Sequence, residues 1–168
     1  NWRKFKDQAG GGILIMNYIY DIYRMRNVTG LEVVRVFAEY DTYRTPVEVE
    51  DFITVSFRFS NGALGNLMAS SCATGASKDG MRGARTEGNR IYGTEGQIVF
   101  AGNELLVYTE NEVPDLNAGE WNKLEMPQGD SYVTFFDSFS EAVLNGESAP
   151  IPAEEGRRDL AVILAAYE

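Results

Sequence analysis

A strand with strict alternation, closed by a tight turn, is the feature that most constrains how this chain can fold. Within Phe52–Phe59, large apolar side chains recur at every second position and polar side chains stand between them. This period of two is typical of a strand that buries one face and leaves the other in water. Ser60-Asn61-Gly62 predicts a hairpin turn, after which the chain returns over Ala63–Ala73. The sequence therefore predicts an antiparallel sheet.

Further strands and helices are expected on both sides of this hairpin. Strands are predicted over Leu31–Asp41, Asn89–Tyr92, Gln97–Phe100, Glu104–Thr109 and Trp121–Met126. Helices are predicted from Gly10 to a stop at Gly30, over Tyr132–Leu144 with Ser131 as N-cap, and over Ala153–Glu168. The last two helices are expected to bury stripes made of Phe135, Phe136, Phe139 and Val143, and of Leu160, Ile163, Leu164 and Tyr167.

The order of these elements predicts the fold class. A helix, several antiparallel strands and two final helices indicate an α+β domain. Its mainly antiparallel open sheet is expected to have helices packed on one face and to leave the other face available for oligomerisation. Asn1–Gln8 is expected to be an extended arm, and Gly75–Arg85 a mobile loop.

Composition excludes several classes of partner. The 168 residues fit a single domain, residues 1–168, with a sizeable core. A net charge of −10 argues against a nucleic-acid or anionic-membrane surface, because both need clustered Lys and Arg. Cys72 is the only cysteine and His is absent, so neither a disulfide framework nor a metal site is expected. No signal peptide or transmembrane run is evident, which favours a cytoplasmic protein.

The segment Gly10–Arg26 carries the most suggestive chemistry. It is apolar almost all the way round, which predicts a helix buried inside the domain. At about 100° per residue, Asn17, Asp21 and Arg24 fall on one stripe that Tyr20 borders. A buried polar stripe needs partners, water or a ligand. Spacing alone also allows a plain ion pair between Asp21 and Arg24 and a satisfied Asn17, so it does not by itself establish a site.

Five short motifs, in order, resemble one known family. They are GGGIL from Gly10, VEDFITVSFRFSNGALG from Val49, IYGTEGQI from Ile91, FSEAVLNGESAP from Phe139 and the final AVILAAYE. Together they resemble the C-terminal domain of the Gfo/Idh/MocA oxidoreductases. Each motif is weak alone, and the signal lies in their order and gaps over almost the whole chain.

The resemblance implies a C-terminal substrate-binding and oligomerisation domain whose N-terminal Rossmann domain is absent here. Family members transfer a hydride between NAD or NADP and a sugar, polyol or related compound. The longer protein is therefore expected to be an NAD(P)-dependent oxidoreductase that forms a homodimer or homotetramer through the sheet face. This chain alone has no Gly-x-Gly-x-x-Gly after a strand and is expected to bind no cofactor and to be inactive.

The same resemblance suggests site residues on the first helix. Many members read GGG-x-L-x-D-x-G-x-H, and here Met16 stands at the Asp position and Tyr20 at the His position. A branch that includes glucose–fructose oxidoreductase has Tyr in place of His, so Tyr20 is the candidate catalytic residue. A phenol ordinarily titrates near pH 10, so this role needs a nearby cation.

Four residues are candidate substrate contacts beside Tyr20: Met16, Asn17, Arg24 and Arg3. Two alternatives stay open at this point. Tyr20 could be a core tyrosine hydrogen-bonded within the domain. The chain could also be a non-catalytic dimerisation or carbohydrate-binding module on the same fold, a pseudoenzyme that has lost the Asp at position 16. Glu50 and Asp51 are expected to cap the entry to a strand rather than to touch substrate.

Overall fold

The computed structural model describes residues 1–73, 89–101, 104–125 and 129–168. Its helical elements are the short helix η1 (Trp2–Lys4), α1 (Lys6–Ala9), the π-helix η2 (Leu14–Tyr18), α2 (Ile19–Thr29), α3 (Ser131–Asn145) and α4 (Ala153–Tyr167). Its strands are β1 (Val33–Asp41), β2 (Phe52–Phe59), β3 (Leu64–Ser70), β4 (Arg90–Tyr92), β5 (Gly96–Ala101), β6 (Glu104–Thr109) and β7 (Trp121–Glu125). The α+β class is confirmed. Within the described ranges, no helix is both long and apolar enough to span a bilayer.

The predicted hairpin forms the centre of a three-stranded sheet in the order β1-β2-β3. Both neighbours run antiparallel to β2, with Val55 opposite Ala38 on one side and Leu67 on the other. The turn closes through a hydrogen bond from the Phe59 N–H to the Ala63 carbonyl oxygen (2.9 Å). Gly62 supplies the positive φ that this turn requires, +89°.

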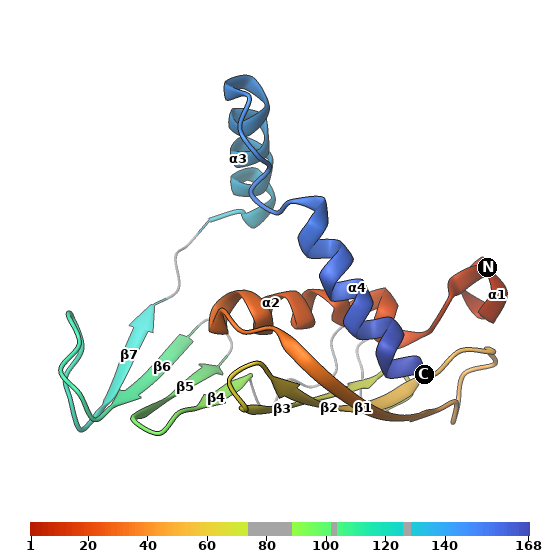
Figure 1. Cartoon of the computed structure of the whole chain (residues 1–168), viewed down its shortest axis with the longest axis horizontal. Coiled ribbons are helices and arrows are strands. Elements are labelled where there is room, and N and C mark those ends of the chain that lie inside the picture. Colours follow the sequence, from red (N-terminus) through yellow and green to blue (C-terminus); the bar gives the residue numbers. More distant parts are fainter. Residues whose placement is uncertain (74–88, 102–103, 126–128) are drawn as a thin grey trace.

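The remaining strands form a second antiparallel sheet in the order β4-β5-β6-β7. Figure 1 shows the strands of both sheets spread across one layer, with α2 and α4 above it. Residues 74–88, between β3 and β4, lie outside the described residues, and the segment Gly75–Arg85 that was expected to be mobile falls within them. The strand expected to end at Met126 is described as far as Glu125.

The hydrophobic core lies between the three-stranded sheet and the helices α2 and α4. The inward side chains of β2 are all nearly inaccessible to solvent, and they meet Leu14, Ile22 and Ile163 from the helical layer. The outward side chains of β2 are Thr54, Ser56 and Arg58, as the alternation predicted. Helix packing on one face of the sheet is therefore confirmed for α2 and α4.

Three expectations about the two ends of the chain are wrong. Asn1–Gln8 is not an extended arm, because it contains η1 and α1. In α4 the buried residues are Asp159, Ile163 and Ala166, whereas Leu160 and Leu164 are exposed.

The third wrong expectation concerns α3, which projects away from the sheets (Figure 1). Its aromatic stripe is exposed rather than buried, and Ala142 is the one buried residue along it. Its N-cap is Asp130, whose side chain accepts a hydrogen bond from the Tyr132 N–H (2.8 Å), rather than Ser131. The stripe was identified correctly, but nothing in a sequence says whether the surface that covers a stripe belongs to the same domain.

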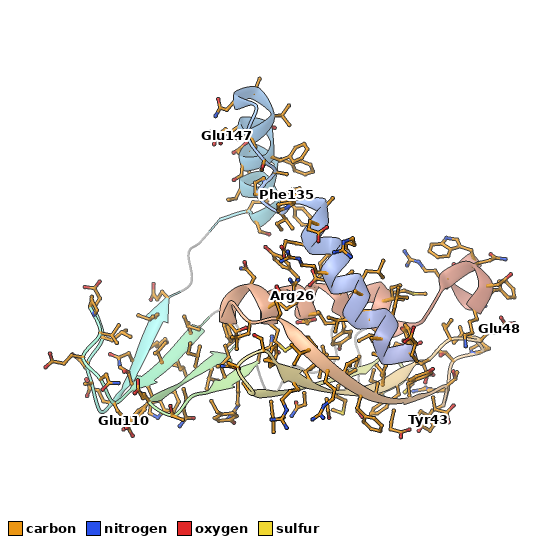
Figure 2. The ribbon with its side chains drawn as sticks, viewed as in Figure 1. Arg26, Tyr43, Glu48, Glu110, Phe135 and Glu147 are labelled. Carbon is orange, nitrogen blue, oxygen red and sulfur yellow. The ribbon has the colours of Figure 1, made fainter. Side chains whose placement is uncertain are left out.

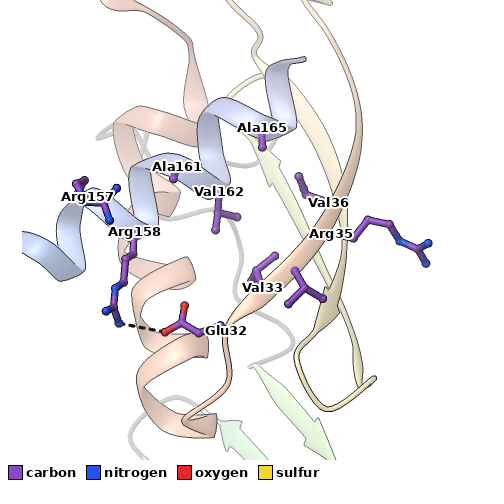
Figure 3. Close-up of a pocket in the computed structure, with 10 residues that line it drawn as sticks. Glu32, Val33, Arg35, Val36, Arg157, Arg158, Ala161, Val162 and Ala165 are labelled. Atoms are coloured by element: carbon purple, nitrogen blue, oxygen red, sulfur yellow. Dashed lines mark hydrogen bonds and ion pairs between the residues drawn. The ribbon is translucent and has the colours of Figure 1, made fainter.

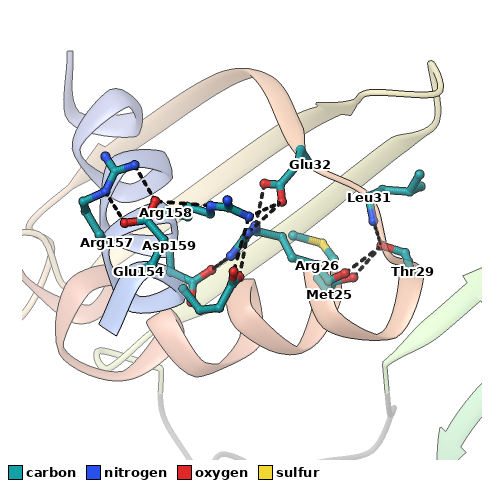
Figure 4. Close-up of polar contacts among 10 residues, drawn as sticks. Met25, Arg26, Thr29, Leu31, Glu32, Glu154, Arg157, Arg158 and Asp159 are labelled. Carbon is teal, nitrogen blue, oxygen red and sulfur yellow. Dashed lines mark hydrogen bonds and ion pairs between the residues drawn. The ribbon is translucent and has the colours of Figure 1, made fainter. Parts of the chain in front are cut away.

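A buried arginine joins α2, the start of β1 and α4 (Figure 4). Arg26 is only 4% exposed and makes a bidentate contact with Glu32, at 3.0 and 2.9 Å. Its guanidinium also donates to Glu155 (3.0 Å) and to the buried Asp159 (2.5 Å). The hydrogen bond with Glu32 is the largest cause that raises the pKa of Arg26 above its ordinary value. The guanidinium of Arg26 is thus paired with three carboxylates, one beside β1 and two on α4.

Candidate functional site

The glycines that open the first helix are required by close backbone approach. Gly10 has a positive φ of +75° and ends α1. A Cβ on Gly11 would lie 2.5 Å from the hydroxyl oxygen of Tyr167, and a Cβ on Gly12 would overlap the backbone carbonyl oxygen of Glu50. The triplet therefore brings the segment that leads into the π-helix η2 against Glu50, just before β2, and against the last turn of α4.

A buried carboxylate, Glu50, organises this contact. Its side chain accepts hydrogen bonds from the backbone N–H of Gly12 (2.7 Å) and of Leu14 (3.0 Å). It also accepts the hydroxyl proton of Tyr167 (2.7 Å), and its backbone oxygen accepts from the Ile13 N–H (3.2 Å). These bonds satisfy N–H groups that the first turn of a helix leaves without partners. Burial, followed by the contact with Glu50, raises the pKa of Tyr167 well above its ordinary range.

Asp51 holds the loop that precedes β2. Its carboxylate accepts the backbone N–H of Tyr43, Arg44 and Thr45 and the Thr45 hydroxyl, at 2.7–3.0 Å. Burial acts to raise the pKa of Asp51, but these hydrogen bonds outweigh burial and hold it well below its usual range. Asp51 thus holds the entry to β2, as the sequence predicted, whereas Glu50 binds the start of the first helix instead of capping the strand.

Gly12→Ala is expected to lower the free energy of unfolding by about 2–3 kcal/mol, because the added methyl group meets the backbone of Glu50. Chemical denaturation measures the change. Gly156→Ala is the matched control, because a Cβ at Gly156 in α4 meets open space. That variant is expected to gain about 0.5–1 kcal/mol from helix propensity. Equal effects at the two glycines would contradict the close approach.

The π-helix alters the polar stripe that the sequence predicted. Hydrogen bonds in a π-helix span five residues rather than four, so η2 inserts an extra residue into the turn that contains Asn17. The assumed 100° per residue therefore does not hold between Leu14 and Tyr18. Asn17 lies in the wide turn, whereas Asp21 and Arg24 lie in regular α-helix. Single π-helical turns inside helices occur frequently at functional sites.

Tyr20 stands on the exposed side of α2, immediately after this wide turn. It is 70% exposed, which excludes the core-tyrosine alternative in this structure. Asp21 and Arg24 form the exposed ion pair that their spacing allowed, with 2.9 Å between Arg24 Nη1 and Asp21 Oδ1. Met16 and Asn17, one turn before Tyr20, are partly buried. The prediction of a helix buried inside the domain is therefore wrong, because the helix is buried on one side only and its other side presents Tyr20 and Arg24 to solvent.

Arg3 is not brought to this helix face. It lies in η1, where its guanidinium stacks on the ring of Trp2, with 5.4 Å between the guanidinium carbon and the ring centroid. Figure 1 shows η1 and α1 beyond the end of the helical layer. Four of the five predicted site residues thus share one helical segment, and Arg3 stands apart.

Two hollows in the described chain lie elsewhere. The larger, about 490 Å³, runs between β1 and α4 and has Val33, Val36, Ala161 and Ala165 in its walls (Figure 3). Its Arg158 is already paired with Glu32. The smaller hollow lies at the start of α3. Tyr20 lines neither of these two hollows.

The described residues differ from the usual binding sites of dinucleotides and of metal ions. Every strand pair described is antiparallel. Dinucleotides bind at the carboxyl ends of parallel strands, beside a glycine-rich turn into a helix. The described residues therefore do not fit a nicotinamide dinucleotide. They also contain no group of three or more Asp, Glu or Cys side chains placed to hold a metal ion.

Comparison with known proteins identifies the family and agrees with the fold described above. A sequence model of the GFO/IDH/MocA C-terminal domain matches residues 1–99. The aldose-aldose oxidoreductase from Caulobacter crescentus, solved with glycerol, is 27% identical with a TM-score of 0.75, and the match covers 99% of this chain and 48% of that one. Levoglucosan dehydrogenase, solved with NADH and levoglucosan, is 25% identical with a TM-score of 0.75 and coverage of 99% and 51%.

A third solved structure extends the likeness in fold. It is the UDP-N-acetylglucosamine 3-dehydrogenase from Acidithiobacillus ferrooxidans, which is 22% identical with a TM-score of 0.70 and coverage of 96% and 48%. The chain therefore spans about half the length of the solved structures that it matches.

Proposed function

The chain belongs to the GFO/IDH/MocA C-terminal domain family, and from this premise we propose that it is the substrate-binding and subunit-association half of an NAD(P)-dependent oxidoreductase. The proposed substrate is a sugar, a polyol or a related compound. The observation that carries this proposal is the exposed Tyr20, which follows a π-helical turn and stands at the position to which the resemblance assigns proton transfer.

Similar structures support the substrate class and the cofactor. Two of them are an aldose-aldose oxidoreductase solved with glycerol and a levoglucosan dehydrogenase solved with NADH and levoglucosan. In the proposed mechanism the Tyr20 hydroxyl exchanges a proton with a substrate hydroxyl or carbonyl oxygen. Arg24, together with Met16 and Asn17 one turn before Tyr20, orients the substrate. The remaining walls of the pocket and the dinucleotide site come from another domain of the same polypeptide.

Cofactor binding tests this division of labour. This chain alone is expected to give no binding heat when titrated with NAD or NADP, because its described strands form no dinucleotide cradle. The complete translation product is expected to bind one of the two and to reduce it with an aldose or polyol. Micromolar binding to residues 1–168 alone would contradict the division. A complete product that binds cofactor but oxidises no compound of this class would favour the non-catalytic alternative.

We also propose that copies associate through the face of the three-stranded sheet opposite the helices. The cross-strand rows on this face place Phe37, Leu64 and Met68, each more than 60% exposed, among polar neighbours. This mixture of apolar and polar side chains is typical of a non-obligate interface. The chain is expected to sediment as a dimer or larger species at micromolar concentration, and Met68→Lys is expected to shift it toward monomer. A wild-type chain that sediments only as monomer would contradict this proposal.

A further inference from the structure

The strand β1 has one unpaired edge in the described chain. It pairs with β2 along its other edge, and no described strand lies beyond it. Strands at the edge of a sheet are usually short or interrupted, so that they do not pair with another chain, whereas β1 is nine residues long. Its register with β2 shifts only between Val33 and Arg35. Residues 35–41 therefore form a regular free edge, and they include neither Pro nor Gly.

This edge carries one charge of each sign, placed symmetrically about Phe37. Arg35 and Glu39 are two residues before and after Phe37, and all three side chains are exposed on the face away from the helices. Figure 2 shows side chains projecting from the strands on that face. Neither charge has an ion-pair partner among the described residues. Arg35 lies opposite Arg58 on β2, and since like charges opposite each other destabilise a sheet, a carboxylate on its free side is favoured.

The backbone of β1 allows two copies to pair in one register. The Asp41 carbonyl oxygen accepts a hydrogen bond from the Asp51 N–H (3.2 Å), so the backbone groups of Asp41 point toward β2. Their direction alternates along an antiparallel strand, so the N–H and C=O groups of Val36 and Ala38 point to the free edge. A two-fold axis at Phe37 places Val36 of one copy opposite Ala38 of the other, where these groups can bond to each other.

The hollow between β1 and α4 lies along the same edge (Figure 3). Its walls include Val36 on β1 and two small side chains on α4, Ala161 and Ala165. A two-fold axis perpendicular to the sheet keeps the helices of both copies on the same side. The side of α4 that faces the hollow therefore leaves room for a second copy beside β1.

We propose that residues 35–41 of β1 pair with the same segment of a second copy, antiparallel and about a two-fold axis at Phe37. Each Arg35 then lies opposite Glu39 of the other copy, and the two sheets of three strands become one continuous sheet. This contact is separate from the sheet-face contact proposed above and does not depend on the proposed activity. Closed tetramers with D2 symmetry use two such different two-fold contacts.

Disulfide formation at the two-fold axis tests the register. Opposite Cα atoms in a non-hydrogen-bonded antiparallel pair are about 4.5 Å apart, a distance that a disulfide spans. In the complete translation product, Phe37→Cys/Cys72→Ser is expected to form linked dimers about 10-fold or more faster than Cys72→Ser alone. Arg35→Cys and Glu39→Cys in the same background are the matched controls. Each is expected to link slowly by itself, because it lies away from the axis, and rapidly when the two are mixed.

Charge reversal gives an independent readout of the same pairing. Sedimentation is measured in a Met68→Lys background, in which the sheet-face contact is weakened. Arg35→Glu and Glu39→Arg are each expected to raise the dissociation constant about 10-fold, because each turns two opposite-charge pairs into two like-charge pairs. Arg35→Glu/Glu39→Arg restores opposite charges and is expected to return the constant to near its starting value.

Four results would overturn the proposal. Phe37→Cys that links no faster than its parent would show that the two edges do not meet. Mixed Arg35→Cys and Glu39→Cys chains that stay unlinked would exclude this register. A double charge reversal that binds as weakly as the single ones would show that the two charges do not pair. Loss of the Phe37→Cys link on adding Met68→Lys would assign the link to the sheet-face contact instead.

Discussion

Arg26→Met is expected to lower the free energy of unfolding by about 3–5 kcal/mol. Arg26 is 4% exposed and is the shared partner of Glu32, Glu155 and Asp159. Its removal leaves Asp159, which is 3% exposed, as a buried carboxylate without its cation. Breaking a buried pair by removing one partner is strongly destabilising, because the remaining charge has lost both water and counter-charge. Urea denaturation monitored by fluorescence of the two tryptophans measures the loss.

A matched control lies two residues away on the same helix. Arg24 makes an ion pair of 2.9 Å with Asp21, but both side chains are partly exposed, at 48% and 32%. Arg24→Met is expected to cost less than about 1 kcal/mol, because exposed ion pairs contribute little. Arg26→Met/Asp159→Leu is expected to recover much of the loss, since a well-packed apolar pair replaces a buried ion pair at little cost. A loss below 1 kcal/mol for Arg26→Met alone would show that the cluster is dispensable.

The loss of stability of Arg26→Met relative to wild type is expected to become smaller as the pH falls. Burial raises the pKa of Asp159 even in the presence of Arg26. A carboxyl group whose folded pKa exceeds its unfolded value, about 3.9, contributes stability that is complete below the unfolded pKa and is lost as pH rises through the folded pKa. Arg26→Met is therefore expected to approach wild-type stability as pH falls from 7 toward 4. A deficit that stays constant over this range would contradict an unpaired Asp159.

The sheet could be predicted from the sequence because its determinants are local. The alternation in Phe52–Phe59 and the turn at Gly62 act over a few residues, and the structure confirms both. The Arg26 cluster could not be predicted in this way. Its partners Glu155 and Asp159 lie about 130 residues further along the chain. A charged residue on a helix usually faces water, and only tertiary packing makes this one an exception.

The candidate site could be predicted only in part, because some of its determinants are local and others depend on long-range contacts. The Asp21–Arg24 pair follows from spacing and is found. The π-helix was not predicted, and the start of this segment makes a long-range contact in which the Glu50 carboxylate accepts from the N–H groups of Gly12 and Leu14. A partner 36 to 38 residues away cannot be read from local spacing. The Tyr167 hydroxyl on the same carboxylate was likewise beyond any local pattern.

The exposure of Tyr20 has an explanation in the proposed second domain. Tyr20 is 70% exposed in this chain and lines neither of the two hollows described above. In the proposed function, the remaining walls of the substrate pocket come from another domain of the same polypeptide. The phenol is then exposed in this chain and enclosed in the complete enzyme.

Tyr20→Phe is accordingly expected to reduce kcat of the complete enzyme by about 10²- to 10⁴-fold, the usual contribution of a positioned general acid or base. The substitution removes one oxygen atom from a side chain that is 70% exposed, so the melting temperature is expected to stay unchanged. KM is expected to change much less than kcat, because the proton transfer acts in the transition state rather than in substrate binding. Steady-state kinetics and thermal unfolding are measured on the same preparation.

Tyr43→Phe is the matched control for this prediction. Tyr43 is also 70% exposed, and its ring packs edge-on against Phe52 in the loop before β2 rather than on α2. The same chemical change there is expected to leave both kcat and the melting temperature unaltered. A Tyr20→Phe enzyme that is stable and turns over at the wild-type rate would remove Tyr20 from the mechanism. A lower melting temperature with intact turnover would instead show that the phenol stabilises the fold or the contact with the second domain.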